Sequence, residues 1–373
     1  MKVVAAIDSF KGSMTSMEAG NAVKKGILAA KPDAEVVVNP LADGGEGTVD
    51  ALIEGLGAKK IPVTVTGPLG EKVSCYYGFL EETKSAVMEM ASAAGITLVT
   101  KKDPLRASTY GVGEMIADAL KRGCKNFMIG IGGSATNDGG IGMLKALGFE
   151  FFDEDGNDVG EGAAALAKIE VIQTENKNPL LSGAKFQIAC DVKNPLCGKQ
   201  GATYIFGSQK GVTEEQKDQI DEAMRHYADV TKESLGCDFA DCEGAGAAGG
   251  LGYAFLSYLA GELIPGVELI LHATGLEEKM KNADVVVTGE GRLDAQTVMG
   301  KAPAGVAALA KKYNAKVIAF AGSVAPEAKV CNRAGIDAFF PIVRGVTTLE
   351  EAMKKENAME NIAATAEQVF RLL

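Results

Sequence analysis

Short apolar runs, glycine-rich polar turns and helical patterns follow one another at the start of the chain. Residues 3–7 and 35–39 are apolar or β-branched runs of strand length. Helical periodicity follows over 16–30, with Ser16 as the expected N-cap, and over 49–56. This repetition predicts a parallel α/β sheet, in which ligands bind outside the carboxyl ends of the strands.

The pattern changes in the middle of the chain. Residues 61–66, 73–80 and 86–90 alternate in polarity or are β-branched, which predicts neighbouring strands that are partly antiparallel. Helices are expected at 109–121, at 213–234 as a charged and solvent-facing helix capped by Thr213, and at 247–260 as a buried one. Further strands are expected at 126–131, 149–152 and 186–190.

Regular alternation returns towards the C-terminus, with strands expected at 284–288, 316–321 and 338–342 and helices at 304–313, 349–353 and 362–372. These strands resemble the first two in character. We therefore predict a discontinuous α/β domain of residues 1–62 plus 276–373, with a parallel sheet of the Rossmann or flavodoxin-like kind. A mixed α/β domain of residues 63–275 is inserted into it.

The strongest single motif is GIGGSATNDGG at residues 130–140, between an apolar run and a helical pattern. A strand, a glycine-rich turn and a helix form a context in which backbone N–H groups converge on an anion. Gly132 and Gly133 allow close approach of a ligand, and Ser134, Thr136 and Asn137 add side-chain donors. The motif fits neither the Walker pattern nor a complete dinucleotide fingerprint.

Composition narrows the class of protein. The chain has 373 residues, 47% of them hydrophobic, and a formal net charge of −11, which disfavours nucleic acid as a partner. The seven cysteines show no CxxC spacing and indicate a reduced, cytoplasmic protein. The N-terminal apolar run reads as a buried strand, and residues 247–260 fall short of the ~20 needed to span a bilayer. No membrane association is therefore expected, and the oligomeric state is left open.

Polar clusters follow several of the predicted strands. Each could be helix caps and turn chemistry, but together they would surround one cleft with carboxylates, cations and glycine backbone. This inventory fits phosphoryl transfer, which needs oxygen ligands for Mg²⁺, cations for phosphate and a carboxylate base. The clusters are Asp8-Ser9-Lys11, Asp43-Glu46-Thr48, Ser134-Thr136-Asn137-Asp138, Asp191-Lys193-Asn194 and Glu290-Arg292-Asp294.

Histidine chemistry is disfavoured, because the chain contains only His226 and His272. The first lies in the charged helix and is expected at the surface. The second is expected to pack or to cap. A Ser-His-Asp hydrolase and a histidine-ligated metal enzyme are therefore disfavoured. The segment GAAGGLG at 246–252 fits either a second backbone cradle or close packing of a buried helix.

The motifs DSFKGS at 8–13, PLADGGEGT at 40–48, CDVKNPL at 190–196 and GEGRLD at 289–294, with the two glycine-rich segments above, resemble the bacterial glycerate kinases of the type-1 family. The resemblance covers essentially the whole chain, in order. It implies ATP-dependent phosphorylation of D-glycerate with Mg²⁺ by a cytoplasmic enzyme of two α/β domains, with the site between them. The implied product is generally 2-phosphoglycerate, with the 3-hydroxyl as the alternative acceptor.

Residue chemistry assigns the expected roles. Lys11 and Arg292 would bind carboxylate or phosphate, and Asp191 or Asp43 would be the base for the substrate hydroxyl. The loop residues Gly132, Gly133, Ser134, Thr136 and Asn137 would bind ATP phosphate. Mg²⁺ would be held by Asp138, Glu290 or Asp294, and the substrate would contact Ser9, Gly44, Gly45, Glu46 and Lys193.

Two rival functions come from other classes. A non-catalytic sensor could bind a hydroxy acid between two lobes, but it needs no Mg²⁺ site, so the many strand-end carboxylates weigh against it. A dehydrogenase lacks support because no complete dinucleotide fingerprint is present.

Overall fold

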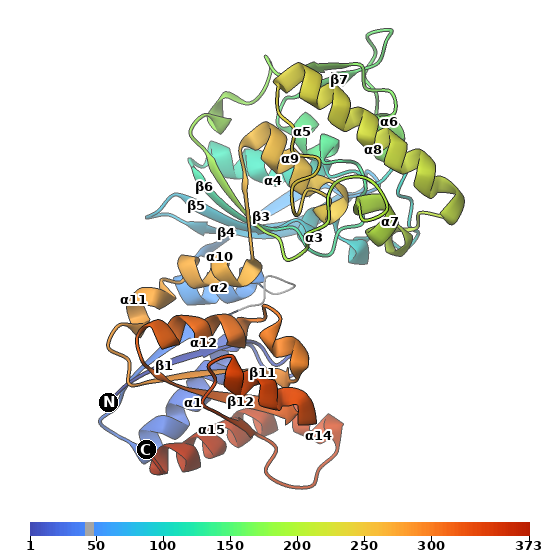
Figure 1. The fold of residues 1–373 in the computed structure, drawn as a ribbon. Helices are drawn as coiled ribbons and strands as arrows, with labels where there is room; N and C mark the ends of the chain where they lie inside the picture. The colour runs from blue at the N-terminus through green and yellow to red at the C-terminus, as the bar shows by residue number, and fades with distance from the viewer. Residues whose placement is uncertain (42–47) are drawn as a thin grey trace. The chain divides into compact units, whose positions relative to one another are not determined.

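A computed structural model describes residues 1–41 and 48–373, and its internal contacts divide the chain into two compact units (Figure 1). The described residues of unit 1 are 1–41, Asp50–Gly57 and Val267–Leu373. Those of unit 2 are 48–49 and Ala58–Gly266. The insertion thus runs to Gly266, whereas we placed its end at residue 275.

Unit 1 is built on a five-stranded parallel sheet in the order β13-β12-β11-β1-β2. This is the flavodoxin-like strand order, and the direction of strand addition reverses between β1 and β11. The predicted parallel α/β fold is confirmed. The strands are β1 (Lys2–Ile7), β2 (Glu35–Pro40), β11 (Val285–Leu293), β12 (Lys316–Val324) and β13 (Ala338–Pro341).

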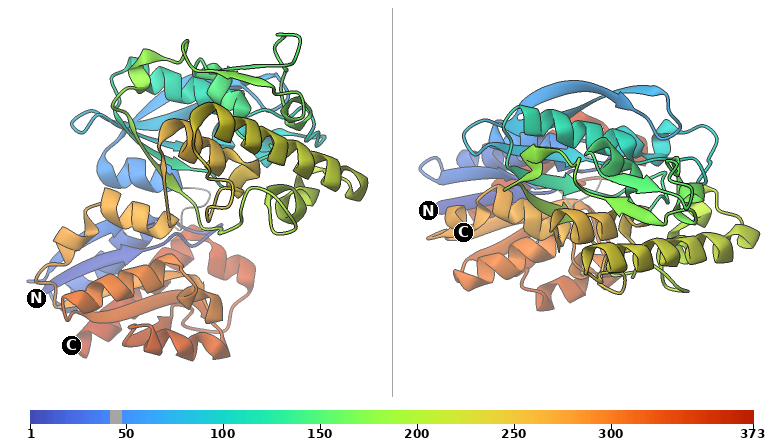
Figure 2. Two further views of the ribbon diagram at one scale, coloured as in Figure 1. Left: turned by 45° about the horizontal axis from the view of Figure 1, so that its top comes forward. Right: turned by 90° about the horizontal axis from the view of Figure 1, so that it is seen from above.

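Helices cover both faces of this sheet (Figures 1 and 2). Helices α1 and α15 pack together, and Val3, Ile7, Phe320 and Phe370 lie in the buried cluster between them and the sheet. Helix α12 contacts β1, β11 and β12. The helices with residues in unit 1 are α1 (Ser16–Ala30), α2 (Thr48–Leu56), α10 (Gly266–Ala273), α11 (Leu276–Met280), α12 (Ala302–Lys312), α13 (Val330–Arg333), α14 (Leu349–Met353) and α15 (Lys355–Arg371).

The N-cap of the first helix differs from the one that we predicted. Thr15, not Ser16, is the N-cap, and it forms a capping box with Glu18. The Ser16 hydroxyl instead donates to the Ile7 carbonyl oxygen at 2.6 Å and accepts from the Leu41 N–H at 2.8 Å. Our N-cap assignment was wrong because Ser16 ties the loops after β1 and β2 together.

Strands β11 and β12 run further than the apolar pattern indicates. Pairing continues past the predicted ends through Arg292 with Ser323 and Leu293 with Val324. The segment 289–294 therefore begins as strand and not as a turn. Only a glycine fits at 322, where a Cβ atom would lie 2.6 Å from the Gly291 carbonyl oxygen.

Unit 2 contains a six-stranded mixed sheet in the order β10-β9-β6-β5-β4-β3. Strands β3, β4 and β5 are antiparallel neighbours, as predicted, and β5, β6, β9 and β10 are parallel. Strands β7 (Glu150–Phe152) and β8 (Val171–Gln173) form a separate two-stranded antiparallel sheet. The sheet strands are β3 (Lys59–Thr66), β4 (Lys72–Leu80), β5 (Ser85–Glu89), β6 (Asn126–Gly130), β9 (Lys185–Ala189) and β10 (Glu262–Ile264).

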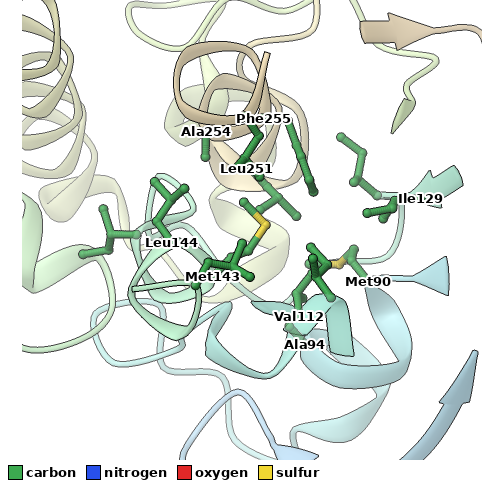
Figure 3. Close-up of a cluster of buried hydrophobic side chains, with 14 of the residues drawn as sticks. Met90, Ala94, Val112, Ile129, Met143, Leu144, Leu251, Ala254 and Phe255 are labelled. Atoms are coloured by element: carbon green, nitrogen blue, oxygen red, sulfur yellow. The ribbon is translucent and has the colours of Figure 1, made fainter. Parts of the chain in front are cut away.

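The core of unit 2 lies between this sheet and the helices α4, α5 and α9 (Figure 3). Ile129 of β6, Met143 of α5 and Phe255 of α9 are fully buried in it. The helices are α3 (Ala91–Ala94), α4 (Tyr110–Lys121), α5 (Ile141–Ala146), α6 (Ala163–Leu166), α7 (Ala202–Phe206), α8 (Glu214–Leu235) and α9 (Leu251–Leu259). Among the helices of the described residues, none is long and apolar enough to cross a membrane.

Candidate functional site

The carboxyl ends of the unit 1 strands open into a pocket of about 610 Å³. It lies where strand order reverses between β1 and β11, the position at which open α/β sheets bind their ligands. The lining contains both charged and apolar side chains. The charged and polar lining comprises Asp8, Ser9, Lys11, Ser13, Glu290, Arg292, Asp294, Lys301, Ser323, Thr347 and Thr348.

Lys11 and Arg292 line this one pocket although they lie near opposite ends of the chain. Lys11 follows β1, and Arg292 lies near the carboxyl end of the neighbouring strand β11. The guanidinium is largely exposed, and its Nε is 3.8 Å from an Asp294 carboxylate oxygen. The two cations therefore line one pocket, as the sequence predicts, and their contact with an anionic ligand stays a prediction.

Glu290 is, like Asp8, a buried acid of the pocket, with 8% of its surface exposed. It accepts a hydrogen bond from the Thr297 hydroxyl at 2.6 Å, and Lys301 Nζ lies 3.5 Å away. Burial raises the pKa of the Glu290 carboxyl, although Thr297 and Lys301 act in the opposite direction. Sequence reasoning missed Lys301, which no motif marks as different from other lysines.

The Asp294 side chain stabilises the turn that follows β11. It caps the 3-10 turn Ala295–Val298, accepting from the Gln296 N–H at 2.8 Å. Mg²⁺ is commonly held by one or two carboxylates together with substrate phosphates. Glu290 and Asp294, both on the pocket wall, fit that donor set. In the part of the chain that is described, no group of three or more His, Cys, Asp or Glu side chains could hold a metal on its own.

The second candidate region is the carboxyl edge of the unit 2 sheet. Strands β6 and β9 pair in parallel, with Gly130 opposite Ala189, so the segments that follow them leave from the same edge. Gly132 and Gly133 are exposed there, whereas Ser134 is buried with 7% exposure. The accessible part of the glycine-rich loop is thus mainly backbone.

The interior of that loop departs from our assignment of roles. Thr136, Asn137 and Asp138 are completely buried. Asn137 donates to the Thr203 hydroxyl at 3.0 Å. The Thr136 hydroxyl and the Asn137 Oδ1 have no described hydrogen-bond partner. A direct contact of these two side chains with ATP stays a prediction that would require the loop to open.

Asp138 holds the loop in place. Its carboxylate accepts from the Thr109 N–H and hydroxyl at 2.8 and 2.7 Å, and from the N–H groups of Gly140 and Gly142 at 3.1 and 3.3 Å. Burial raises the pKa of the Asp138 carboxyl, and these donors oppose the rise. Both carboxylate oxygens already accept hydrogen bonds at the start of α5, so the geometry favours a structural role for Asp138, and our metal assignment of it stays a prediction.

Lys210 is a residue that sequence reasoning missed. Only 2% of it is exposed, and its Nζ donates to the Thr136 carbonyl oxygen at 2.7 Å. Burial lowers the pKa of the Lys210 ammonium to about 7, while Asp138 partly opposes that shift. In the sequence it stands between polar residues and a glycine, a pattern typical of an exposed turn.

The segment 246–252 packs against the loop. A Cβ atom on Gly249 would lie 2.2 Å from the Thr136 carbonyl oxygen, and the Gly139 N–H donates to the Gly249 carbonyl oxygen at 2.9 Å. Gly246 approaches the Pro195 carbonyl oxygen equally closely. Of the two readings left open above, the structure shows close packing.

Some of the remaining predicted site residues are exposed, and the others lie outside the described residues. Asp191, exposed after β9, accepts from the Gly266 N–H at 2.9 Å. Lys193 forms an exposed ion pair with Glu243 at 3.0 Å. Asp43, Gly44, Gly45 and Glu46 lie outside the described residues.

Neither histidine lines the unit 1 pocket. His226 Nε2 lies 2.7 Å from the Ile169 carbonyl oxygen, and Glu170 is 3.7 Å away. His272 is exposed on α10. His226, expected at the surface, is thus half-buried, and His272, expected to pack or to cap, is exposed. That neither residue takes part in the chemistry stays a prediction.

Comparison with known proteins gives one consistent result. The family model described as the glycerate kinase family matches residues 3–373. The glycerate kinase of Bacillus subtilis (strain 168) is 45% identical over 99% of this chain and 97% of its own. The glycerate 2-kinase of Escherichia coli (strain K12) is 45% identical over 98% of each chain. A crystal structure of a Salmonella typhimurium LT2 protein assigned as glycerate kinase 2 has a TM-score of 0.91 at 43% identity, covering 99% of this chain and 97% of that one.

Proposed function

Because the chain belongs to the glycerate kinase family, a family of kinase enzymes, we propose that it transfers the γ-phosphoryl group of ATP to D-glycerate with the help of Mg²⁺. We further propose the 2-hydroxyl as the acceptor and 2-phosphoglycerate as the product, supported by the E. coli relative named glycerate 2-kinase. The alternative acceptor is the 3-hydroxyl. The cytoplasm remains the location that we expect from the sequence.

The observation that most supports phosphoryl transfer is the pairing of Lys11 and Arg292 in one pocket with Glu290 and Asp294. Phosphoryl transfer depends mainly on positioning and charge neutralisation. A compact ammonium at Lys11 suits a single phosphate oxygen, whereas the planar guanidinium of Arg292 can bind two oxygens at once.

Mg²⁺, when bound, would supply positive charge that stabilises the transferring phosphoryl group. Glu290 and Asp294 are the residues proposed to hold it. Asp191 is the described candidate for the base that accepts the substrate hydroxyl proton, since it is exposed at a strand end. The exposed backbone of Gly132 and Gly133 remains our proposal for phosphate contact in unit 2.

A coupled assay with the purified chain tests this function directly. ATP should be consumed only when D-glycerate is present, and a phosphorus NMR spectrum of the product should show the phosphate on a secondary carbon. Phosphate on the primary carbon would establish the 3-kinase alternative. Binding of glycerate without any ATP consumption would favour the two-lobed sensor.

A further inference from the structure

The unit 1 pocket has an apolar wall that the charged residues do not account for. Phe10 of the loop after β1, Ile342 after β13, and Leu349 and Met353 of α14 line it. Phe10 and Ile342 are buried, but Leu349 exposes 76% of its surface and Met353 exposes 37%. Apolar side chains exposed at the rim of a pocket are typical of ligand contact.

The wall is held against the loop that bears Lys11. A Cβ atom placed on Gly12 would lie 3.0 Å from the Met353 Cε, so the Met353 side chain lies over the backbone one residue after Lys11. The Thr348 hydroxyl accepts from the Glu351 N–H at 3.2 Å and caps α14. The apolar and cationic parts of the pocket are therefore adjacent.

Size and polarity together identify the class of ligand. About 610 Å³ lies in the range of pockets that enclose ligands of cofactor size, and a three-carbon acid would fill a small part of it. Every carbon of glycerate bears oxygen, so glycerate would leave Leu349 and Met353 against water. A nucleotide has both an apolar aromatic base and an anionic phosphate chain, which match the two parts of the pocket.

We infer that this pocket is the nucleotide site of the enzyme, with the base of a nucleoside triphosphate against Leu349 and Met353 and its phosphates at Lys11 and Arg292. The inference rests on the proposed function and deepens it by assigning the nucleotide to unit 1. It also gives a role to α14, whose exposed apolar residues no motif marks. The place of the pocket at the β1/β11 reversal point agrees with it.

Calorimetric titration of the full chain with ADP, in the absence of glycerate, tests the assignment. The variant is Leu349→Gln combined with Met353→Gln, which keeps helix-forming side chains of similar length. The control is Val346→Gln, since Val346 is fully exposed on the preceding segment and does not line this pocket. We expect the double variant to weaken ADP binding about tenfold, from the lost burial of apolar surface. The control should bind as the wild-type chain does.

Steady-state kinetics separates the two substrates. The double variant should raise KM for ATP and leave KM for D-glycerate within about twofold, because only uniform nucleotide binding is lost. Unchanged ADP affinity in the double variant, or a raised KM for glycerate with intact ADP affinity, would overturn the nucleotide assignment while the proposed function stands. A wild-type chain that neither binds ADP nor consumes ATP would overturn both.

Discussion

The ammonium of Lys210, buried in unit 2, donates a hydrogen bond to the backbone carbonyl oxygen of Thr136 at a distance of 2.7 Å. The two residues are far apart in the sequence, and the bond fixes the middle of the glycine-rich loop from inside. Asp138, two residues further on, is fully buried and exerts an electrostatic influence on the same lysine. A buried charge of this kind makes stability depend on pH.

The first prediction follows from the lowered pKa of Lys210, about 7 in the folded chain against its ordinary 10.5. Between these values the unfolded chain binds more protons than the folded one, so the contribution of Lys210 to the free energy of unfolding rises with pH. Relative to Lys210→Met, the wild-type chain should gain up to about 1.4 kcal/mol per pH unit above pH 7. Urea unfolding of both chains at pH 7 and pH 9 measures this. Parallel pH dependences would contradict the buried titration.

The second prediction concerns Asp138→Asn. An amide nitrogen would face at least one of the N–H donors that the carboxylate now accepts from Thr109, Gly140 and Gly142. We expect a loss of about 1–3 kcal/mol in the free energy of unfolding. Thermal unfolding without Mg²⁺ provides the measurement. If stability is retained while the Mg²⁺ concentration needed for activity rises, Asp138 is a metal ligand after all.

The third prediction separates the two cations of the pocket. Lys11→Met should lower kcat sharply if the ammonium acts on the transferring phosphoryl group, while Lys25→Met, exposed on α1, serves as the control. Arg292→Lys keeps the charge but loses the two-point geometry, so KM should rise or kcat should fall. Wild-type kinetics in both variants would show that the residues only shape the loop.

The fourth prediction addresses Mg²⁺. Glu290→Gln keeps an oxygen acceptor for the Thr297 hydroxyl but removes the charge. We expect the Mg²⁺ concentration at half-maximal rate to rise about tenfold or more, because a neutral amide is a poorer ligand for a hard cation. The matched control is Asp33→Asn, an exposed acid just before β2 at the opposite edge of the sheet. If the Mg²⁺ requirement rose equally in Glu290→Gln and Asp33→Asn, the effect would reflect the change in net charge and not the loss of a metal ligand.

The fifth prediction is that both histidines are dispensable. His226→Gln and His272→Gln should each retain kcat within about twofold, because neither residue lines the pocket and surface substitutions rarely perturb a fold. Activity assays at saturating ATP and D-glycerate test each variant. A collapse of kcat in a chain that still folds, as judged by circular dichroism, would require a mechanism that uses imidazole.

The sequence alone determined the order of helices and strands, and it placed clusters of polar residues at the carboxyl ends of the strands. Apolar runs followed by polar glycine turns predicted the parallel sheet of unit 1. The alternating polarity after residue 60 predicted the partly antiparallel strands of unit 2. Local periodicity suffices there because side-chain alternation and helical spacing are properties of neighbouring residues. The six long motifs likewise predicted the family that the comparisons show.

Tertiary structure decided which polar residues face a ligand and which hold the fold. Asp138 and Glu290 look alike as strand-end acids, yet one is enclosed by four donors and the other lines a pocket. Lys210 has the sequence context of a surface lysine and lies buried against Thr136, while Leu349, an apolar residue of a predicted helix, is exposed. Burial and hydrogen bonding arise from segments far apart in the chain. No local pattern of residue types could have distinguished these cases.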